Sequence, residues 1–348
     1  MSDENNSIKY AALESEVFHV NVTDLENGLV ERTRMRRLLD FLSRLKNPLT
    51  IIGIVIVIGL IIAAVLAPLV APYNPIKIDL TSKNLPPSLD HFFGTDGFGR
   101  DIFSRILYGA QISLFVGIVS VLGAVAVGVP LGIFSAYRGG YFDTLIMRIM
   151  DILLAFPSII LAIAIAMVIG AGMHTVTIAI LVVSIPIYAR IARGSALAVI
   201  QETYIEAARA IGAPGVRIIF RHIFPNILAP ILVEMTLDIG SAVLSLAGLS
   251  FLGLGAPPPY TYDWGRMISD NFSYQAVTRY WWQLTFPGLA IVFCVLGWNL
   301  LGDGLRDAID PKLRLKLSKQ AKKLIKGLKK NQRLLKKPSA KVSGGGVA

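Results

Sequence analysis

The feature that most constrains this chain is a set of long segments without any charged side chain. Four of them lie between Pro48 and Ile76, between Arg105 and Arg138, from Ile152 to Ala189 and from Tyr280 to Gly302. About 20 helical residues cross a hydrocarbon core, whereas a large water-soluble core would show apolar runs of roughly 10 to 14 residues broken by turns. Only 16% of the 348 residues are charged, below the roughly 25% of soluble proteins. The sequence therefore predicts an all-α integral membrane protein.

The apolar runs and their Pro, Gly and polar boundaries predict six transmembrane helices. Their expected limits are about 49–71, 112–137, 144–171, 176–200, 226–254 and 284–301. The chain then consists of an N-terminal segment (1–47), a first transmembrane helix (48–71), an external loop (72–108), a core membrane domain of five helices (109–306) and a basic tail (307–348). The first apolar run starts late and is too long for a cleaved signal peptide, so we expect it to remain as an anchor.

Lys and Arg are distributed unequally between the segments that flank these spans. Seven precede Pro48 and fourteen follow Leu305, whereas the three segments expected on the opposite side hold four, none and two. Positively charged segments stay in the cytoplasm. Both termini are therefore expected to be cytoplasmic, in a multi-pass protein of the cell membrane.

The residues that usually carry chemistry do not form a catalytic or metal-binding pattern. His19, His91, His174 and His222 lack metal-ligand spacing, and Cys294, the only cysteine, is expected to be an apolar filler. No Gly-x-x-x-x-Gly-Lys-Ser/Thr loop occurs, so no nucleotide site is expected on this chain. A membrane enzyme is not favoured, and no metal or cofactor is expected.

Small residues recur at intervals of four along the second predicted span. They are Ser120, Ala124, Gly128 and Gly132, with Gly109, Ser113 and Gly117 preparing a parallel line. Small residues let helix backbones approach closely in lipid. We expect a packing role for this stripe, with pore lining as the alternative.

The connection between the fourth and fifth predicted spans, residues 200–226, contains a short helix and a reversal. A helix is expected at about 201–211, and Gly212 can adopt the left-handed conformation that ends it. A second short helix, about 216–224, returns to the membrane, and Pro225 opens the next span. Such an elbow, fixed at both ends to transmembrane helices, is suited to transmitting a movement from a soluble partner.

The same connection resembles a known family signature. Glu206-Ala207-Ala208, then Gly212 and, after about ten residues, Phe224-Pro225 resemble the signature of the permease subunits of ABC importers. His222 stands where isoleucine is more usual, and this variant resembles the peptide and nickel branch of that family.

A second match precedes the second span. It consists of Gly94-Thr95-Asp96, Gly99-Arg100-Asp101, Ser104-Arg105 and the run Gly109-Ala110-Gln111-Ile112-Ser113-Leu114. This resembles the "C" permeases of dipeptide, oligopeptide and nickel importers, with Ala110-Gln111 where that family has Ala-Arg. The resemblance covers about residues 37–314.

The resemblance implies the type I permease fold of ABC importers and the import of dipeptides or oligopeptides, with nickel or oligosaccharides as alternatives. It implies that a helix docks on an ATPase subunit through Glu206, Ala207, Ala208, Arg209, Gly212 and Pro225. A sister permease would complete the pore, two cytoplasmic ATPase subunits would bind ATP and Mg, and an external binding protein would deliver the substrate. The alternatives are an ordinary loop helix at this place and, for the whole chain, an ion-coupled secondary transporter, although no internal repeat typical of that class is found.

Two carboxylates, Glu234 and Asp238, lie one turn apart on the fifth predicted span. Carboxylates at this depth should face the bundle or a wet cavity and have a partner. One interpretation is a translocation pathway in which they meet the amino terminus of a peptide. The other is a buried ion pair with Arg148, Arg190 or Arg193.

Further charged residues are expected to have structural roles. Asp96 can cap a helix, and Asp101 and Arg105 have the spacing of an ion pair, with contact to a binding protein as the alternative. Arg148 and Asp151 are expected to form an interfacial pair. The basic amphipathic tail after Pro311 is expected to lie on the lipid bilayer rather than on nucleic acid.

Overall fold

The computed structural model describes residues 47–255, 257 and 262–309. The predictions for the N-terminal segment and for the basic tail fall almost entirely outside the described residues and remain predictions. The long helices are α4 (Pro48–Val70), α5 (Ile102–Arg138), α6 (Gly140–Ala155), α7 (Ser158–Ile169), α8 (Met173–Ile200), α11 (Phe224–Phe251) and α14 (Trp282–Ile309). The short ones are η1 (Leu80–Ser82), α9 (Thr203–Ala210), α10 (Gly215–Ile218), η2 (Ile219–Ile223), α12 (Trp264–Asn271) and α13 (Tyr274–Thr278).

Membrane-spanning helices dominate the described chain, as the apolar runs predict. In the described residues, five helical segments are long and apolar enough to cross a membrane, and the count is six if the bent pair α6–α7 is one broken span. α4, α8 and α11 lie close to predicted spans, because each apolar run satisfies its backbone hydrogen bonds within itself. In the described part, β structure is limited to one isolated bridge between Thr95 and Asp101.

The third predicted span, 144–171, is not one straight helix. α6 and α7 are bent by 93° at the break between them. Pro157 lacks an amide hydrogen and disfavours helical geometry at the preceding residue, and Phe156 is accordingly extended, with φ −88° and ψ 138°. The prediction of a continuous helix was wrong here, although Pro157 was the signal for the break.

α5 starts at Ile102 rather than near residue 112, so it extends well beyond the predicted span. Its cap is Asp101, whose Oδ2 accepts hydrogen bonds from Ser104 N at 2.8 Å and Ser104 Oγ at 2.7 Å. A carboxylate in this position satisfies amide hydrogens that the first helical turn leaves without a partner. Residues 102–111, which precede the predicted second span, therefore form the first turns of the helix.

The small-residue stripe packs α5 against α8, as expected. A Cβ atom added at Gly128 would lie 2.6 Å from Ile185 O, and one at Gly132 would lie 2.2 Å from Ala189 O. Ser120 Oγ donates a hydrogen bond to Thr177 O at 3.1 Å. The backbones of the two helices thus touch where a larger residue could not fit.

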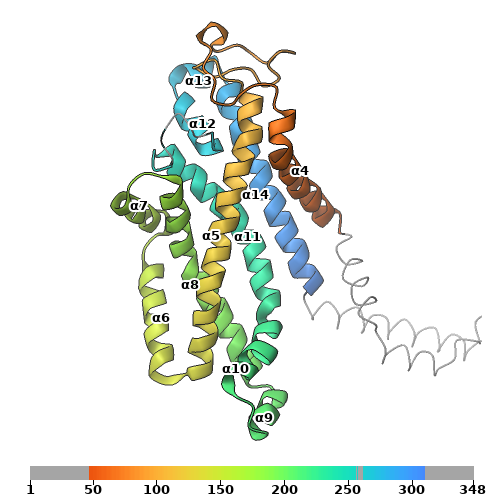
Figure 1. Cartoon of the computed structure of the whole chain (residues 1–348), viewed down its shortest axis with the longest axis vertical. Helices are drawn as coiled ribbons and strands as arrows, with labels where there is room; N and C mark the ends of the chain where they lie inside the picture. Colours follow the sequence, from red (N-terminus) through yellow and green to blue (C-terminus); the bar gives the residue numbers. More distant parts are fainter. Residues whose placement is uncertain (1–46, 256, 258–261, 310–348) are drawn as a thin grey trace, which may run out of the picture. The chain divides into compact units, whose positions relative to one another are not determined.

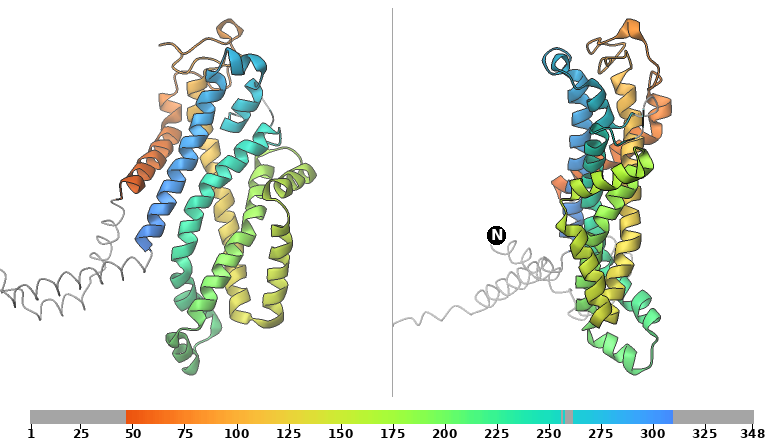
Figure 2. Two further views of the ribbon diagram at one scale, coloured as in Figure 1. Left: turned by 180° about the vertical axis from the view of Figure 1, so that it is seen from behind. Right: turned by 90° about the vertical axis from the view of Figure 1, so that its left-hand side faces the viewer.

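α5 also contacts α11, and α14 lies between α11 and α4 (Figure 1). Glycines permit close packing here too, because a Cβ at Gly304 would lie 2.2 Å from Thr50 Cγ2. Figure 2 shows α9 and α10 at one end of the helices, and α12, α13 and the segment between α4 and α5 at the other.

Candidate functional site

The short helix α9 ends in a glycine-dependent reversal, as predicted for residues 201–211. Gly212 has a φ of +77°, the left-handed conformation that costs other residues free energy. Gly212 N donates to Arg209 O at 2.9 Å and Ala213 N donates to Ala208 O at 3.0 Å. This pair of bonds is the Schellman motif, which satisfies the last carbonyl groups of a helix.

The return to the membrane differs from the prediction of a separate helix at 216–224. α10, η2 and α11 form one continuous helical segment from Gly215 to Phe251. Pro225 lies in the first turn of α11 rather than at a new start, and η2 is a π-helical turn in which Phe224 N donates to Ile219 O. Proline cannot donate its own hydrogen bond, and wide turns of this kind absorb such a defect. The elbow is therefore joined to α11 by an uninterrupted helix.

The elbow has a buried and an exposed side. Ile205 and Ala208 are buried against the rest of the chain. Glu206, Ala207 and Arg209 are exposed.

Two large apolar side chains of the elbow are also exposed. Ile211, directly after α9, is 85% exposed, and Phe220, in η2, is 70% exposed. The guanidinium of Arg209 lies 5.7 Å from the centre of the Tyr137 ring at the end of α5. The structure thus gathers Glu206, Ala207, Arg209 and the Gly212 turn at one corner, while Ala208 points inward.

A cavity of about 270 Å³ lies between α7, α8 and α11. Its polar lining residues are Ser158, Ser184, Glu234, Asp238, Ser241 and Ser245, and aliphatic side chains complete the wall. Both carboxylates singled out from the sequence therefore face the same space. The three helices bring this set together from parts of the chain that are about 90 residues apart.

The expected arginine partners of these carboxylates are engaged elsewhere. Arg193 binds Asp143 through Nε at 2.5 Å and Nη2 at 2.6 Å, and Arg190 Nη2 lies 2.6 Å from Asp151 Oδ1. Among the described residues, no ion pair within 4.0 Å reaches Glu234 or Asp238. The ion pair with Arg190 or Arg193, one of the two interpretations of these carboxylates, is therefore not formed.

Asp238 has hydroxyl partners on α8, Tyr188 and Ser184. Tyr188 Oη donates to Asp238 Oδ2 at 3.0 Å, and Tyr188 is fully buried. The sequence reasoning missed Tyr188, although a tyrosine one turn after Ser184 in an apolar span was a usable signal. The predicted pair of Arg148 with Asp151 is also replaced, because Asp151 bonds to Arg190 across to α8.

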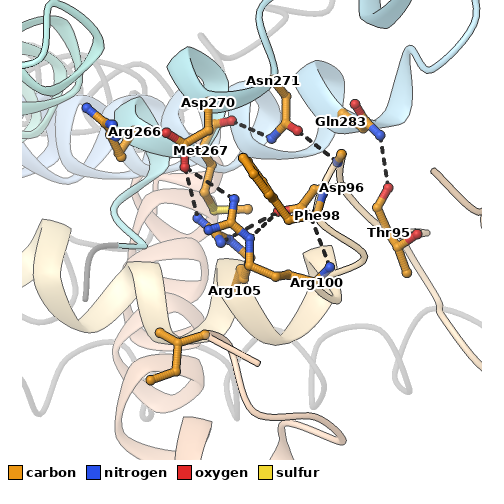
Figure 3. Close-up of polar contacts among 12 residues, drawn as sticks. Thr95, Asp96, Phe98, Arg100, Arg105, Arg266, Met267, Asp270, Asn271 and Gln283 are labelled. Atoms are coloured by element: carbon orange, nitrogen blue, oxygen red, sulfur yellow. Dashed lines mark hydrogen bonds and ion pairs between the residues drawn. The ribbon is translucent and has the colours of Figure 1, made fainter. Parts of the chain in front are cut away.

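At the opposite end, a buried charge network joins the segment after α4 to α12 (Figure 3). Arg100 Nε lies 2.6 Å from Asp96 Oδ2, and Arg100 Nη2 lies 3.2 Å from Asp270 Oδ2. Arg105 also approaches both acids, at 3.5 Å and 3.8 Å, and Arg266 Nε lies 2.8 Å from Asp270 Oδ1. The predicted roles are exchanged: Asp96 pairs with the arginines, and Asp101 is the cap.

Other contacts fix the same network. Gln283 Nε2 donates to Thr95 O at 3.1 Å, and Gly97 N donates to Asn271 Oδ1 at 3.1 Å (Figure 3). Two further acids at this end of the chain, outside the network, have shifted pKa values. Hydrogen bonds from Thr81 lower the pKa of Asp79, whereas burial raises the pKa of Asp263, the cap of α12. Asp96, Arg100 and Arg105 are nearly inaccessible, so this end of the chain is held by internal charge pairing.

Comparisons with known proteins identify the family of the chain. The sequence profile of a family described as "binding-protein-dependent transport system inner membrane component" matches residues 128–315. A second profile, the N-terminal transmembrane domain of oligopeptide transport permease C, matches residues 40–87. A chain of the inward-facing MetNI methionine ABC transporter aligns with a TM-score of 0.48 at 20% identity, over 59% of this chain and 97% of that chain.

Named relatives resemble the chain over most of its length. The dipeptide transport system permease protein DppC of Alkalihalophilus pseudofirmus is 47% identical over 269 residues, which are 77% of this chain and 88% of that protein. The probable D,D-dipeptide transport system permease protein DdpC of Escherichia coli is 46% identical over 76% of this chain and 88% of that protein. The glutathione transport system permease protein GsiD of Shigella sonnei is 48% identical over 74% of this chain and 84% of that protein.

The family profile spans more than half of the chain, and its span includes the elbow, the cavity carboxylates and most of the membrane helices. The chain belongs to the family of inner membrane components of binding-protein-dependent transport systems, the permease subunits of ABC importers.

Proposed function

We propose that this permease imports dipeptides or other short peptides and that its elbow docks on an ATPase subunit. The relatives named for dipeptide, D,D-dipeptide and glutathione transport support peptides over nickel or oligosaccharides. In this proposal both termini are cytoplasmic, and a sister permease forms the other half of the pathway. Two ATPase subunits bind ATP and Mg, and an external binding protein delivers the peptide.

The observation that carries the docking proposal is the exposed corner at α9. Glu206 and Arg209 offer charge, and Ile211 and Phe220 offer apolar surface. Protein interfaces combine a buried apolar centre with a polar rim, and this corner has both components. Glu206 and Arg209 are on the exposed side of α9. Ile205 and Ala208, on its other side, are buried against the rest of the chain.

In this proposal the elbow converts docking into movement of the membrane helices. On one side α9 follows α8 after a few residues, and on the other it leads into the continuous segment Gly215–Phe251. Since α8 and α11 both line the cavity, a shift of α9 by the ATPase changes the walls around Glu234 and Asp238. Repeated closing and opening of the ATPase pair would then alternately open and close the pathway.

Substitution of one acidic residue on α9 tests the docking proposal. Glu206→Ala should weaken attachment of the ATPase subunit by about tenfold, or ~1.4 kcal/mol, and lower ATP-dependent dipeptide uptake in proteoliposomes. Glu202→Ala is the matched control, because Glu202 is exposed in the same loop and its side chain makes no capping hydrogen bond. Equal attachment and uptake in both variants would contradict the proposal.

A further inference from the structure

The cavity between α7, α8 and α11 contains two carboxylates and no cation from the described part of the chain. Glu234 and Asp238 both line it, and the nearest arginines of α8 are committed to Asp143 and Asp151. Arg306 of α14 acts on Glu234 through space but forms no ion pair with it. Both carboxylates are partly exposed. A carboxylate without a cation inside a membrane helix is costly, so such residues usually mark a pathway or a ligand contact.

Two serine hydroxyl groups of α11 add hydrogen-bond acceptors to the cavity wall. Ser245 Oγ donates to Ser241 O at 2.9 Å, and Ser241 Oγ donates to Leu237 O at 3.5 Å. Their protons are therefore directed at their own helix, and the oxygen lone pairs remain for the cavity. Tyr188 likewise directs its proton at Asp238.

These acceptors form one line along α11. Glu234, Asp238, Ser241 and Ser245 follow one another at intervals of four, three and four residues, which place them on the same helix face. Ser158 at the start of α7 and Ser184 on α8 face this line across the cavity. A ligand that fits such a lining must bring several hydrogen-bond donors and a positive charge, as a primary ammonium group does with its three N–H donors.

We propose that this cavity binds the α-ammonium group of the passing peptide, between the carboxylates of Glu234 and Asp238 and the serine oxygens of α11. The inference rests on the proposed function and specifies which group of the peptide this chain recognises. A volume of about 270 Å³ lies just under the roughly 300–1,000 Å³ of complete ligand sites, so it suits one end of a peptide. The remainder of the peptide would lie toward the rest of the pathway.

The test compares two dipeptides that differ only in the ammonium group. The complete transporter, with sister permease, ATPases and binding protein, is reconstituted in vesicles, and uptake of Ala-Ala is divided by uptake of N-acetyl-Ala-Ala. Asp238→Asn and Glu234→Gln should each lower this ratio by about tenfold, mainly through slower uptake of the free amine, because one charge–charge contact is lost. Asp307→Asn is the matched control, because it removes an exposed carboxylate of α14 that does not line the cavity.

A second variant keeps the test decisive if a carboxylate substitution prevents assembly. Ser241→Ala with Ser245→Ala removes two acceptors without changing any charge, and it should lower the same ratio several-fold. A parallel loss of uptake of both peptides would overturn the inference, as would an unchanged ratio in the serine variant. If neither the wild type nor any variant imports the acetylated peptide, another subunit selects for the free ammonium group, and the inference is overturned.

The two proposals fail in different ways. If the wild-type transporter imports neither dipeptide, the proposed function is wrong and the inference falls with it. If the wild-type transporter imports Ala-Ala normally and only the ratio is insensitive to the cavity variants, the function stands and the ammonium site is excluded.

Discussion

The contact between α5 and α8 predicts the effect of adding a single methyl group. In Gly128→Ala, the new Cβ would lie 2.6 Å from Ile185 O and 2.9 Å from Tyr188 Cβ. Ordinary contacts begin at 3.4 Å, so the backbone of α8 would have to move away by roughly 0.8 Å. Overpacking of this kind costs about 1–3 kcal/mol, because neighbouring helices cannot both keep their positions.

Gly59→Ala is the matched control for this change. Gly59 lies in α4, and nothing is within 4 Å of a Cβ added there. Alanine is favoured over glycine in a helix by about 1 kcal/mol, and both variants receive this gain. The free energy of unfolding of Gly128→Ala should therefore lie about 1–3 kcal/mol below that of Gly59→Ala.

Reversible unfolding in mixed detergent micelles, followed by far-UV circular dichroism, measures this difference. Because Tyr188 holds Asp238, the displacement of α8 should also slow dipeptide uptake in Gly128→Ala and leave it unchanged in Gly59→Ala. Equal unfolding free energies for the two variants would refute the close contact and the packing role of the stripe.

Two further predictions concern the ends of helices. Gly212→Ala should destabilise the elbow by about 1–2 kcal/mol, because an added Cβ meets no atom within 4 Å and only the left-handed backbone is strained. Faster amide hydrogen exchange in α9 measures it, Gly212→Asn should be affected less, and unchanged exchange in the alanine variant would contradict the assigned backbone. Asp101→Ala should cost about 0.5–2 kcal/mol through loss of the α5 cap, whereas Asp101→Asn should keep most of it. Thermal unfolding distinguishes the two, and equal losses would show that the charge next to His91, and not the cap, is the stabilising feature.

The sequence indicated the elbow better than it indicated the surroundings of the cavity. The reversal at Gly212 follows from local signals, because a glycine after a short amphipathic helix meets the geometry that a helix end requires. The fusion of α10, η2 and α11 was not foreseen, because a proline in the first turn of α11 can equally well start a new helix. Glu234 and Asp238 could be picked out as unusual, but their neighbours Tyr188 and Ser184 could not be assigned to them.

Charge pairing shows the limit of sequence reasoning most clearly. Asp101 and Arg105 have the spacing of an ion pair, yet Asp101 caps α5 and Arg105 approaches Asp96 and Asp270. Spacing on a helix restricts which side chains share a face, but it does not rank partners from other elements. Asp270 comes from α12, far along the chain, and no local pattern could have predicted its contact with Arg100.

The sequence by itself determined the membrane-spanning helices and the helical turn between α8 and α11, because each of these depends on hydrogen bonds and apolar surface within one short segment. Only the tertiary structure decided which acids meet which bases and where the carboxylates of α11 are left without a base in the described chain. These outcomes depend on distances between helices, and those distances are set by close backbone contacts such as that of Gly128 with Ile185.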